Sequence, residues 1–260
     1  MKKLFTIILS LALMIPCAFA EDRTPETAEP ERYTCGDYVY SLLDDGTAEI
    51  ISYKGIVEDV EIPDSLDGIT VTGIGKYAFF ANKFIERVSI PDSVIHIGYS
   101  PFIHSERLEQ ITIPDSVTGI DGNPCCNCTS LTEILVSPDH PYLEVKDGVL
   151  ISKPDKRLVC YPGGLEAETY TVPDGIQVIG DHAFFGCKFL EEITIPNSVT
   201  SIGQGAFSFS NLTNLLLTDN VRSIGEKAFY CCNSLIVTVP ADSYAEEYCR
   251  ENDIRYTTIH

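Results

Sequence analysis

The cysteine cluster Cys125-Cys126-Asn127-Cys128 contains a C-x-x-C pattern, a spacing used by zinc ligands and by dithiol redox centres. Metal ligation and redox exchange both proceed through a thiolate, which requires a favourable environment for the charged form. A buried cysteine instead behaves as a small apolar residue with a weak S–H donor. The position of these thiols in the fold therefore decides between metal binding, redox chemistry and a structural role.

Acidic residues that follow a proline, or once a threonine, form a second set with possible chemistry. They are Asp64, Asp92, Asp115, Asp139, Asp174 and Asp219, with Asn197 in the equivalent place. Carboxylates stacked in a row repel one another, and a divalent cation would relieve that repulsion. Pro-Asp-Ser is also ordinary turn chemistry, in which the carboxylate accepts local backbone hydrogens. We favour the turn interpretation and predict no metal and no cofactor.

The histidines fit no catalytic motif. They are His96, His104, His140, His182 and His260, and the chain contains no H-E-x-x-H pattern, no nucleophile elbow and no phosphate-binding glycine loop. The one Cys-His pairing that the spacing permits would bring His104 near Cys126 or Cys128. An isolated pair of this kind is weak evidence for nucleophilic catalysis. The sequence therefore predicts a protein that is not an enzyme.

Composition narrows the class of ligand. The chain has 260 residues, 18 basic and 38 acidic side chains, a formal net charge of -20 and 44% hydrophobic residues. The apolar content is sufficient for a sizeable core. Nucleic acids and anionic membrane surfaces require a basic patch, and no Lys/Arg cluster is present. We therefore expect no nucleic-acid partner.

The first residues predict export. Lys2 and Lys3 precede an apolar run that ends near Ala18-Phe19-Ala20, so residues 1–20 are predicted to be a signal peptide. Residues 21–32 are charged and proline-containing, which is typical of an acidic flexible spacer. No later run is long enough to span a bilayer, so we expect no membrane insertion after signal cleavage. The predicted location is secreted, extracellular or associated with the cell surface.

An internal repeat determines the expected fold. Ile90-Pro91-Asp92-Ser93-Val94 recurs 23 residues later at 113–117, and related segments at 172–176 and 195–199 are again 23 apart. Each unit continues with an Ile-Gly pair, an Ala-Phe pair and a strand such as Leu108-Glu109-Gln110-Ile111-Thr112-Ile113. A fixed period of this length indicates a solenoid whose coils bury their apolar residues only by stacking. We predict a β-rich leucine-rich-repeat solenoid over 71–240.

The repeat assigns places to most cysteines. Cys125 falls in the buried Phe position, and Cys128 falls three residues later, in a position that other coils fill with Asn82, Ser105, Cys187, Ser210 and Cys232. We expect the small residue there to donate a hydrogen bond into the turn of its own coil, and the Ile-Gly glycines to permit a sharp bend. This favours structural cysteines over metal or redox chemistry. Cys126 and Cys231 fall outside the core positions.

Three departures from the repeat predict caps and an insertion. Residues 33–70 are expected to form an N-terminal β cap, with strands 38–42 and 47–51 joined at Asp44-Asp45-Gly46. About 139–170, a β-hairpin insertion is expected, with its turn at 153–156. Residues 241–260 are expected to form a C-terminal cap with a short helix from the capping box at Ser243 and a final strand. Both caps would cover the exposed core of a terminal coil.

The outward positions of the repeat strands are the expected ligand surface of such a solenoid. The candidates are Glu86, Arg87, Glu109, Gln110, Thr112, Glu133, Glu191, Glu192, Thr194 and Asn214, with Leu216 in the same row. They are mostly polar and acidic, and no aromatic or basic row marks a glycan or polyanion site among them. The alternative is a solvated face that only keeps the protein soluble.

The repeated Ile-Pro-Asp-Ser-Val, Ile-Gly, Ala-Phe, x-x-Cys and Leu-x-x-Ile-x-Ile motifs resemble the BspA-like leucine-rich repeat of exported bacterial, and some protozoan, surface proteins. The resemblance covers about 33–260. It implies adhesion or protein–protein binding without catalytic residues, so we expect a protein or surface ligand of unknown identity, bound by a monomer or a weakly self-associating chain. The alternative is a self-associating structural spacer or surface component.

Overall fold

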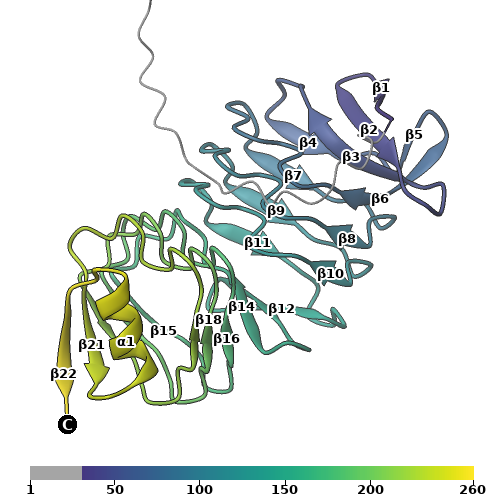
Figure 1. Ribbon diagram of the computed structural model, residues 1–260. Helices are drawn as coiled ribbons and strands as arrows, with labels where there is room; N and C mark the ends of the chain where they lie inside the picture. Colours follow the sequence, from purple (N-terminus) through teal and green to yellow (C-terminus); the bar gives the residue numbers. More distant parts are fainter. Residues whose placement is uncertain (1–30) are drawn as a thin grey trace, which may run out of the picture. The chain divides into compact units, whose positions relative to one another are not determined.

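The structure is a computed structural model that describes residues 31–260. The predicted signal peptide, 1–20, and residues 21–30 of the predicted spacer lie outside the described residues. Within 31–260, the chain winds through successive coils in which short strands stack side by side (Figure 1). This arrangement confirms the predicted solenoid with about 23 residues per coil.

The Leu-x-x-Ile-x-Ile segments form one series of short parallel strands. One sheet contains β4 (Asp59–Glu61), β7 (Arg87–Ser89), β9 (Gln110–Thr112) and β11 (Glu133–Leu135). A second contains β15 (Thr169–Thr171), β17 (Glu192–Thr194), β19 (Asn214–Leu216), β21 (Ile236–Pro240) and β22 (Tyr256–Ile259). The middle residue of each three-residue strand points into the coil and its neighbours point out, as the period of two requires. We call the outward surface of these strands and the residue before each of them the strand face.

The Ile-Gly segments, joined by one strand of the insertion, form the other series. It contains β6 (Ile69–Ile74), β8 (His96–Ile97) and β10 (Gly119–Ile120), then β14 (Arg157–Cys160), β16 (Val178–Ile179), β18 (Ser201–Ile202) and β20 (Ser223–Ile224). The glycines of these pairs do not have a positive φ, so the expected sharp bend is wrong. They allow close packing between coils. A Cβ on Gly203 would lie 2.6 Å from the Asp181 backbone nitrogen, and one on Gly180 would lie 2.7 Å from the Leu158 oxygen.

A ladder of rings, buried except for the half-buried Tyr53, occupies the Phe position along the core. Ring centroids are 4.9 Å apart for Tyr53–Phe79, 4.8 Å for Phe79–Phe102, 5.2 Å for Tyr161–Phe184 and Phe184–Phe207, and 5.6 Å for Phe207–Phe229. Tyr248 of the C-terminal cap ends the ladder 6.1 Å from Phe229. Cys125 stands in the same position in its coil and is buried, as predicted. Stacked rings at the coil spacing give each coil the apolar contacts that it cannot make alone.

The insertion is a three-stranded antiparallel meander of β12 (Leu143–Lys146), β13 (Val149–Ser152) and β14. The predicted hairpin is β13–β14, and β12 is an additional strand that the sequence pattern did not predict. Because β14 pairs in parallel with β16, the insertion rejoins the solenoid. In the described region β11 and β15 each end their sheet, so the ladder of repeat strands is interrupted at the insertion.

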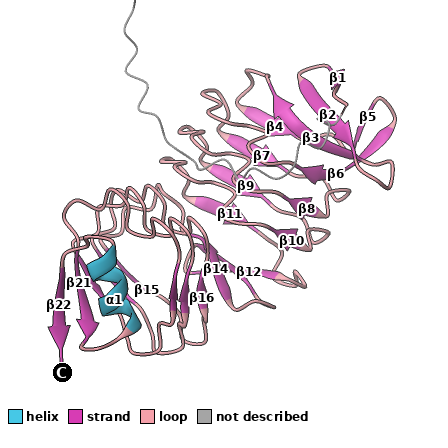
Figure 2. Ribbon diagram, in the orientation of Figure 1, coloured by secondary structure: helices cyan, strands magenta, loops and turns pink. Residues whose placement is uncertain are grey.

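Both predicted caps are present. The N-terminal cap is an antiparallel set of β1 (Tyr33–Cys35), β2 (Tyr38–Leu42) and β3 (Ala48–Tyr53), with β3 parallel to β6, and β5 (Ser65–Leu66) folds back onto β6. The C-terminal cap contains α1 (Tyr244–Glu251), drawn in cyan in Figure 2, and β22. Ser243 caps α1 by accepting a hydrogen bond from the Glu246 N–H at 3.2 Å. Neither α1 nor any other part of 31–260 is a helix long and apolar enough to cross a membrane.

Candidate functional site

Parallel pairing brings the predicted binding residues into rows on the strand face. Arg87, Gln110 and Glu133 are partners in register at the first position of successive strands. Beyond the insertion, Glu192 and Asn214 are partners in the equivalent row. The third positions form a parallel row that contains Thr112 in the first sheet and Thr194 beside Leu216 in the second.

Three of the predicted residues lie just before the strands and not within them. Glu86, Glu109 and Glu191 each precede a strand by one residue. Backbone hydrogen bonds still stack them, since the Glu109 N–H donates to the Glu86 carbonyl at 2.8 Å. The strand assignment was therefore wrong for these three, although they form an additional acidic row of the strand face.

The strand face is strongly acidic. The segments 58–61, 86–89, 109–112, 132–135, 168–171, 191–194 and 213–216 contain nine acidic residues and one basic residue. Residues of like charge on neighbouring strands repel one another and favour a partner of opposite charge.

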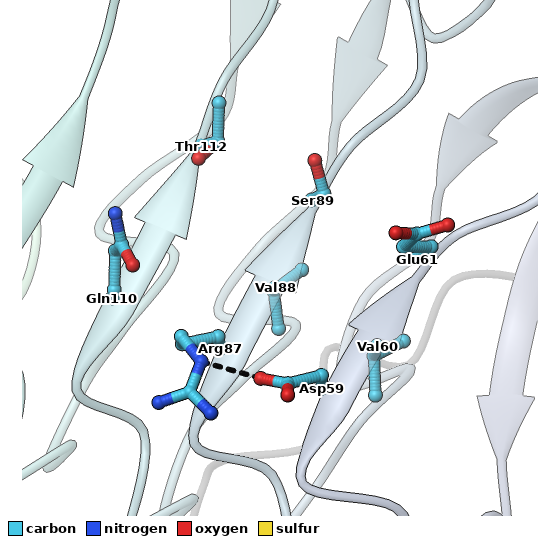
Figure 3. A pocket seen from close by; sticks show the side chains of 8 residues that line it. All are labelled: Asp59, Val60, Glu61, Arg87, Val88, Ser89, Gln110 and Thr112. Atoms are coloured by element: carbon cyan, nitrogen blue, oxygen red, sulfur yellow. Dashed lines mark ion pairs between the residues drawn. The ribbon is translucent and has the colours of Figure 1, made fainter.

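Ion pairs neutralise part of the N-terminal half of this face. Arg87 pairs with Asp59, as Figure 3 shows, and lies 4.0 Å from Glu86. Arg107 pairs with the same Glu86 and lies 3.7 Å from Glu58. In the C-terminal half, the exposed carboxylates of Glu191 and Glu192 have no ion pair with any residue of 31–260. Glu109 and Glu133 also lack an ion pair within 31–260, but Glu191 and Glu192 place two unpaired carboxylates next to each other at β17.

Two open hollows lie on or beside this surface. One of about 280 Å³ is lined by Asp59, Val60, Glu61, Arg87, Val88, Ser89, Gln110 and Thr112 (Figure 3). The other, of about 360 Å³, is lined by Asn197, Leu216, Leu217, Thr218, Asp219, Asn220, Pro240 and Ile259. The first contains three of the predicted binding residues, so the geometry groups part of the predicted set at the N-terminal half.

The C-x-x-C cysteines are interior residues. Cys125, Cys126 and Cys128 are all buried. The Cys128 side chain and burial both raise the pKa of the Cys125 thiol, and burial raises the pKa of Cys126 to about 12. Protonated, buried thiols are poor nucleophiles and poor metal ligands. Within 31–260 no three His, Cys, Asp or Glu side chains converge to hold a metal ion.

The small position after the Phe joins neighbouring coils. The Ser105 hydroxyl donates to the Phe79 carbonyl at 3.0 Å, and the Cys128 thiol donates to the Phe102 carbonyl at 3.1 Å. These acceptors belong to the preceding coil, so the expectation of a hydrogen bond within the same coil was wrong. The Phe carbonyl of one coil lies within hydrogen-bond distance of the small side chain of the next coil, so a short donor such as Ser or Cys fits this position.

The aspartate turns are closed by backbone groups. The Val94 N–H donates to the Pro91 carbonyl at 3.0 Å, and Val199 donates to Pro196 at 3.1 Å. The aspartates of the row are exposed, and the Asp64 carboxylate accepts from the Ser65 hydroxyl at 3.0 Å. The turn interpretation therefore fits, but the carboxylates do not accept the backbone hydrogens that we expected.

His104 pairs with an amide and not with a thiol. Its Nδ1 lies 2.8 Å from Asn127 Nδ2, whereas the Cys126 thiol contacts the Ser100 hydroxyl at 3.2 Å. Burial lowers the pKa of His104. This arrangement orients the histidine in the turn and does not provide a base for a cysteine nucleophile.

The structure contains a second feature that the sequence pattern did not predict, a row of rings one or two residues after the buried Phe position. We call Phe80, His104, Phe185, Phe209 and Tyr230 the aromatic ridge. Ring centroids are 5.9 Å apart for Phe80–His104, 5.2 Å for Phe185–Phe209 and 5.5 Å for Phe209–Tyr230. The available signal was an additional ring directly after the core Phe in several coils. The additional ring follows the core Phe by one residue in some coils and by two in others, so no fixed spacing reveals the row.

Stacked coils of this length, with two series of short parallel strands and two caps, define a leucine-rich-repeat solenoid. The chain matches the model of the BspA type leucine rich repeat region in six copies, over residues 52–146 and 160–256. The chain belongs to this family. A comparison with curated proteins finds no match.

Solved structures of other leucine-rich-repeat proteins are similar to this chain. A leucine-rich repeat protein from Eubacterium ventriosum is 22% identical, with a TM-score of 0.53, over 80% of this chain and 71% of that chain. A leucine rich cell surface protein from Faecalibacterium prausnitzii is 28% identical, with a TM-score of 0.47, over 83% of this chain and 55% of that chain. The first likeness shows the fold alone.

Membership in the family indicates a general function. Leucine-rich repeats generally mediate protein–protein interaction, and families with this fold are generally non-enzymatic. BspA-type proteins are typically secreted or found at the cell surface.

Proposed function

We propose that this chain is an exported binding module that engages a protein ligand, on a cell surface or in the extracellular space, through its strand face. The observation that carries the proposal is the excess of nine acidic residues over one basic residue in stacked rows of that face. A solvated surface needs no such alignment, whereas a solenoid uses its stacked outward positions as an extended contact surface. We further propose that residues 1–20 direct export and that 21–32 are a spacer before the N-terminal cap.

The charge pattern defines the kind of partner. Glu191 and Glu192 are exposed and lack ion pairs within 31–260, so a basic side chain can bind there without displacing an existing partner. In the N-terminal half, Arg87 and Arg107 already neutralise nearby carboxylates. The ligand is therefore a protein with a basic patch, contacted first around β17. Association should weaken with salt, since exposed charges are screened.

Capture with charge-reversed variants tests this function. Immobilised protein is presented to serum and extracellular-matrix proteins, and any captured protein is then titrated in purified form. The variant Glu191→Lys/Glu192→Lys should reduce binding at least about tenfold, because like charges replace attractive ones.

The control carries the same change in net charge elsewhere. Glu144 and Glu251 are exposed and lie outside the strand face, in β12 and α1. Glu144→Lys/Glu251→Lys should bind as the unmodified chain does. Equal loss in both variants would show that net charge alone matters, and failure to capture any protein would contradict the binding function.

A further inference from the structure

Three rings of the aromatic ridge are exposed, whereas Phe185 is buried and His104 is half-buried. Phe80, Phe209 and Tyr230 are 60%, 38% and 51% exposed, whereas the core rings of the same coils, Phe79 and Phe207, are fully buried. Phe185 connects the ridge to the interior through contacts with Ile103 and Cys126. Phe209 and Tyr230 are adjacent exposed rings, with centroids 5.5 Å apart, and burial of such rings in a complex is strongly favourable.

The turn backbone is left-handed two residues after the core Phe position. Phe209 has a φ of 60°, in the left-handed region, where the equivalent position of the preceding coil is Gly186 with a φ of 73°. A bulky residue in this region costs about 1 kcal/mol or more relative to glycine. The conformation belongs to the repeat turn, since Ala81, His104, Asn127 and Cys231 adopt it at the same position with φ of 50–60°, and Phe209 is the bulkiest side chain placed there.

Charge identifies what can cover the ridge. The six turn segments 77–81, 100–104, 123–127, 182–186, 205–209 and 227–231 contain no acidic residue and one lysine, Lys227. The chain as a whole carries a net charge of -20. Two copies of such an acidic chain repel one another at most approaches. The turn segments lack carboxylates and expose Phe209 and Tyr230, so a second copy can bury these rings there without bringing acidic residues of these segments together.

We propose that the aromatic ridge is a self-association surface, and that its occupant is the ridge of a second copy of this chain. The contact is two-fold symmetric and centred on Phe209 and Tyr230, so each ring meets the same patch of the partner. It involves the turn segments and leaves the strand face of both copies available. Cys231 follows Tyr230 directly and is the exposed cysteine among those of 31–260. It therefore provides a chemical probe of the contact.

Sedimentation velocity over a concentration series, with reductant present, tests the proposal. The unmodified chain should dimerise in a concentration-dependent manner, and added salt should strengthen the dimer by screening the repulsion between two acidic chains. Phe209→Ser/Tyr230→Ser should raise the dimer Kd at least about tenfold. Phe84→Ser removes a ring that is 44% exposed but lies outside the ridge, and it should leave the Kd unchanged.

Thiol trapping provides a second measurement that does not depend on a variant folding correctly. Oxidised glutathione accepts two electrons and two protons from two Cys231 thiols, which yields one intermolecular disulfide and two molecules of reduced glutathione. We expect a covalent dimer that Cys231→Ser abolishes. A chain that stays monomeric at all concentrations, or a dimer unaffected by Phe209→Ser/Tyr230→Ser, would overturn the proposal. Capture by the strand face is measured separately, so either proposal can fail without the other.

Discussion

Removing one rung of the buried ring ladder should destabilise the protein severely. Phe184 is fully buried and stacks on Tyr161 and Phe207, with ring centroids 5.2 Å away on both sides. Tyr170 contacts the same ring at 6.1 Å. Because each neighbouring ring is held by its own coil, the space left by Phe184→Ala cannot collapse. We therefore expect a loss of about 4 to 5 kcal/mol in the free energy of unfolding, the upper part of the range for Phe→Ala.

The same coil offers a matched control. Phe189 lies five residues further on and is 46% exposed. Phe189→Ala removes the same atoms from a position that solvent already reaches, so it should cost less than about 1 kcal/mol. Guanidinium denaturation in reductant measures both variants. The signal is far-ultraviolet circular dichroism or tyrosine fluorescence, since the chain contains no tryptophan.

The denaturation slope is informative as well as the midpoint. A solenoid is held together by contacts between neighbouring coils, so loss of one rung can uncouple the coils on either side and lower the slope. A difference below about 1 kcal/mol between Phe184→Ala and Phe189→Ala, with equal slopes, would refute the argument that the ladder stabilises the stack.

Two further predictions concern titration and thiol reactivity. Burial lowers the pKa of His182 from its ordinary 6.5, so the unfolded chain takes up the proton first. The free energy of unfolding should be highest above pH 6.5 and fall as the pH drops below that value, and His182→Gln should reduce this fall when the denaturation midpoints at pH 7.5 and 5.5 are compared. In the native protein an aromatic disulfide reagent should react fastest with Cys231, which is exposed, and Cys231→Ser should remove the fast phase. Comparable reaction at the buried Cys128 before denaturant is added would contradict the structural role of that thiol.

The sequence periodicity predicted the architecture because every coil of a stacked fold has the same local structure. The spacing of Pro91 and Pro114 gives the coil length, and alternation around Ile111 gives the inward and outward positions. Ser243 and Glu246 predict the helix start through a local hydrogen bond. Each of these inferences involves residues within one coil or between equivalent places in adjacent coils.

The 23-residue repeat does not predict the contacts across the insertion, because the insertion changes the spacing between coils. Cys126 has no predicted place, yet it is buried against Phe185 from a coil beyond the insertion. At the same junction, the Asn123 side chain donates to the His182 carbonyl at 2.8 Å. These contacts join segments 59 residues apart, and no repeat of 23 relates them. They depend on how β12, β13 and β14 return the chain to the stack.

The candidate site was predictable in outline and not in its electrostatics. Alternation placed Arg87, Gln110 and Glu133 on one surface, but it does not show that Arg107 reaches back to Glu86. The length of an arginine side chain lets it contact carboxylates on a neighbouring coil, which a residue pattern does not encode. As a result the acidic character of the face is reduced near β7 and retained near β17.

The two proposed surfaces have complementary consequences for binding. The strand face repels a second copy through its acidic rows, whereas the turn segments of the aromatic ridge carry no acidic residue at all. A dimer formed through the ridge therefore presents two strand faces, and a partner displayed densely on a surface can engage both. The second contact then forms at the high effective concentration set by the first. Phe209→Ser/Tyr230→Ser should thus weaken binding to an immobilised partner while leaving the affinity for the same partner in dilute solution unchanged. If the unmodified chain bound the immobilised and the dissolved partner with equal affinity, self-association would have no effect on ligand binding, and this prediction would be wrong.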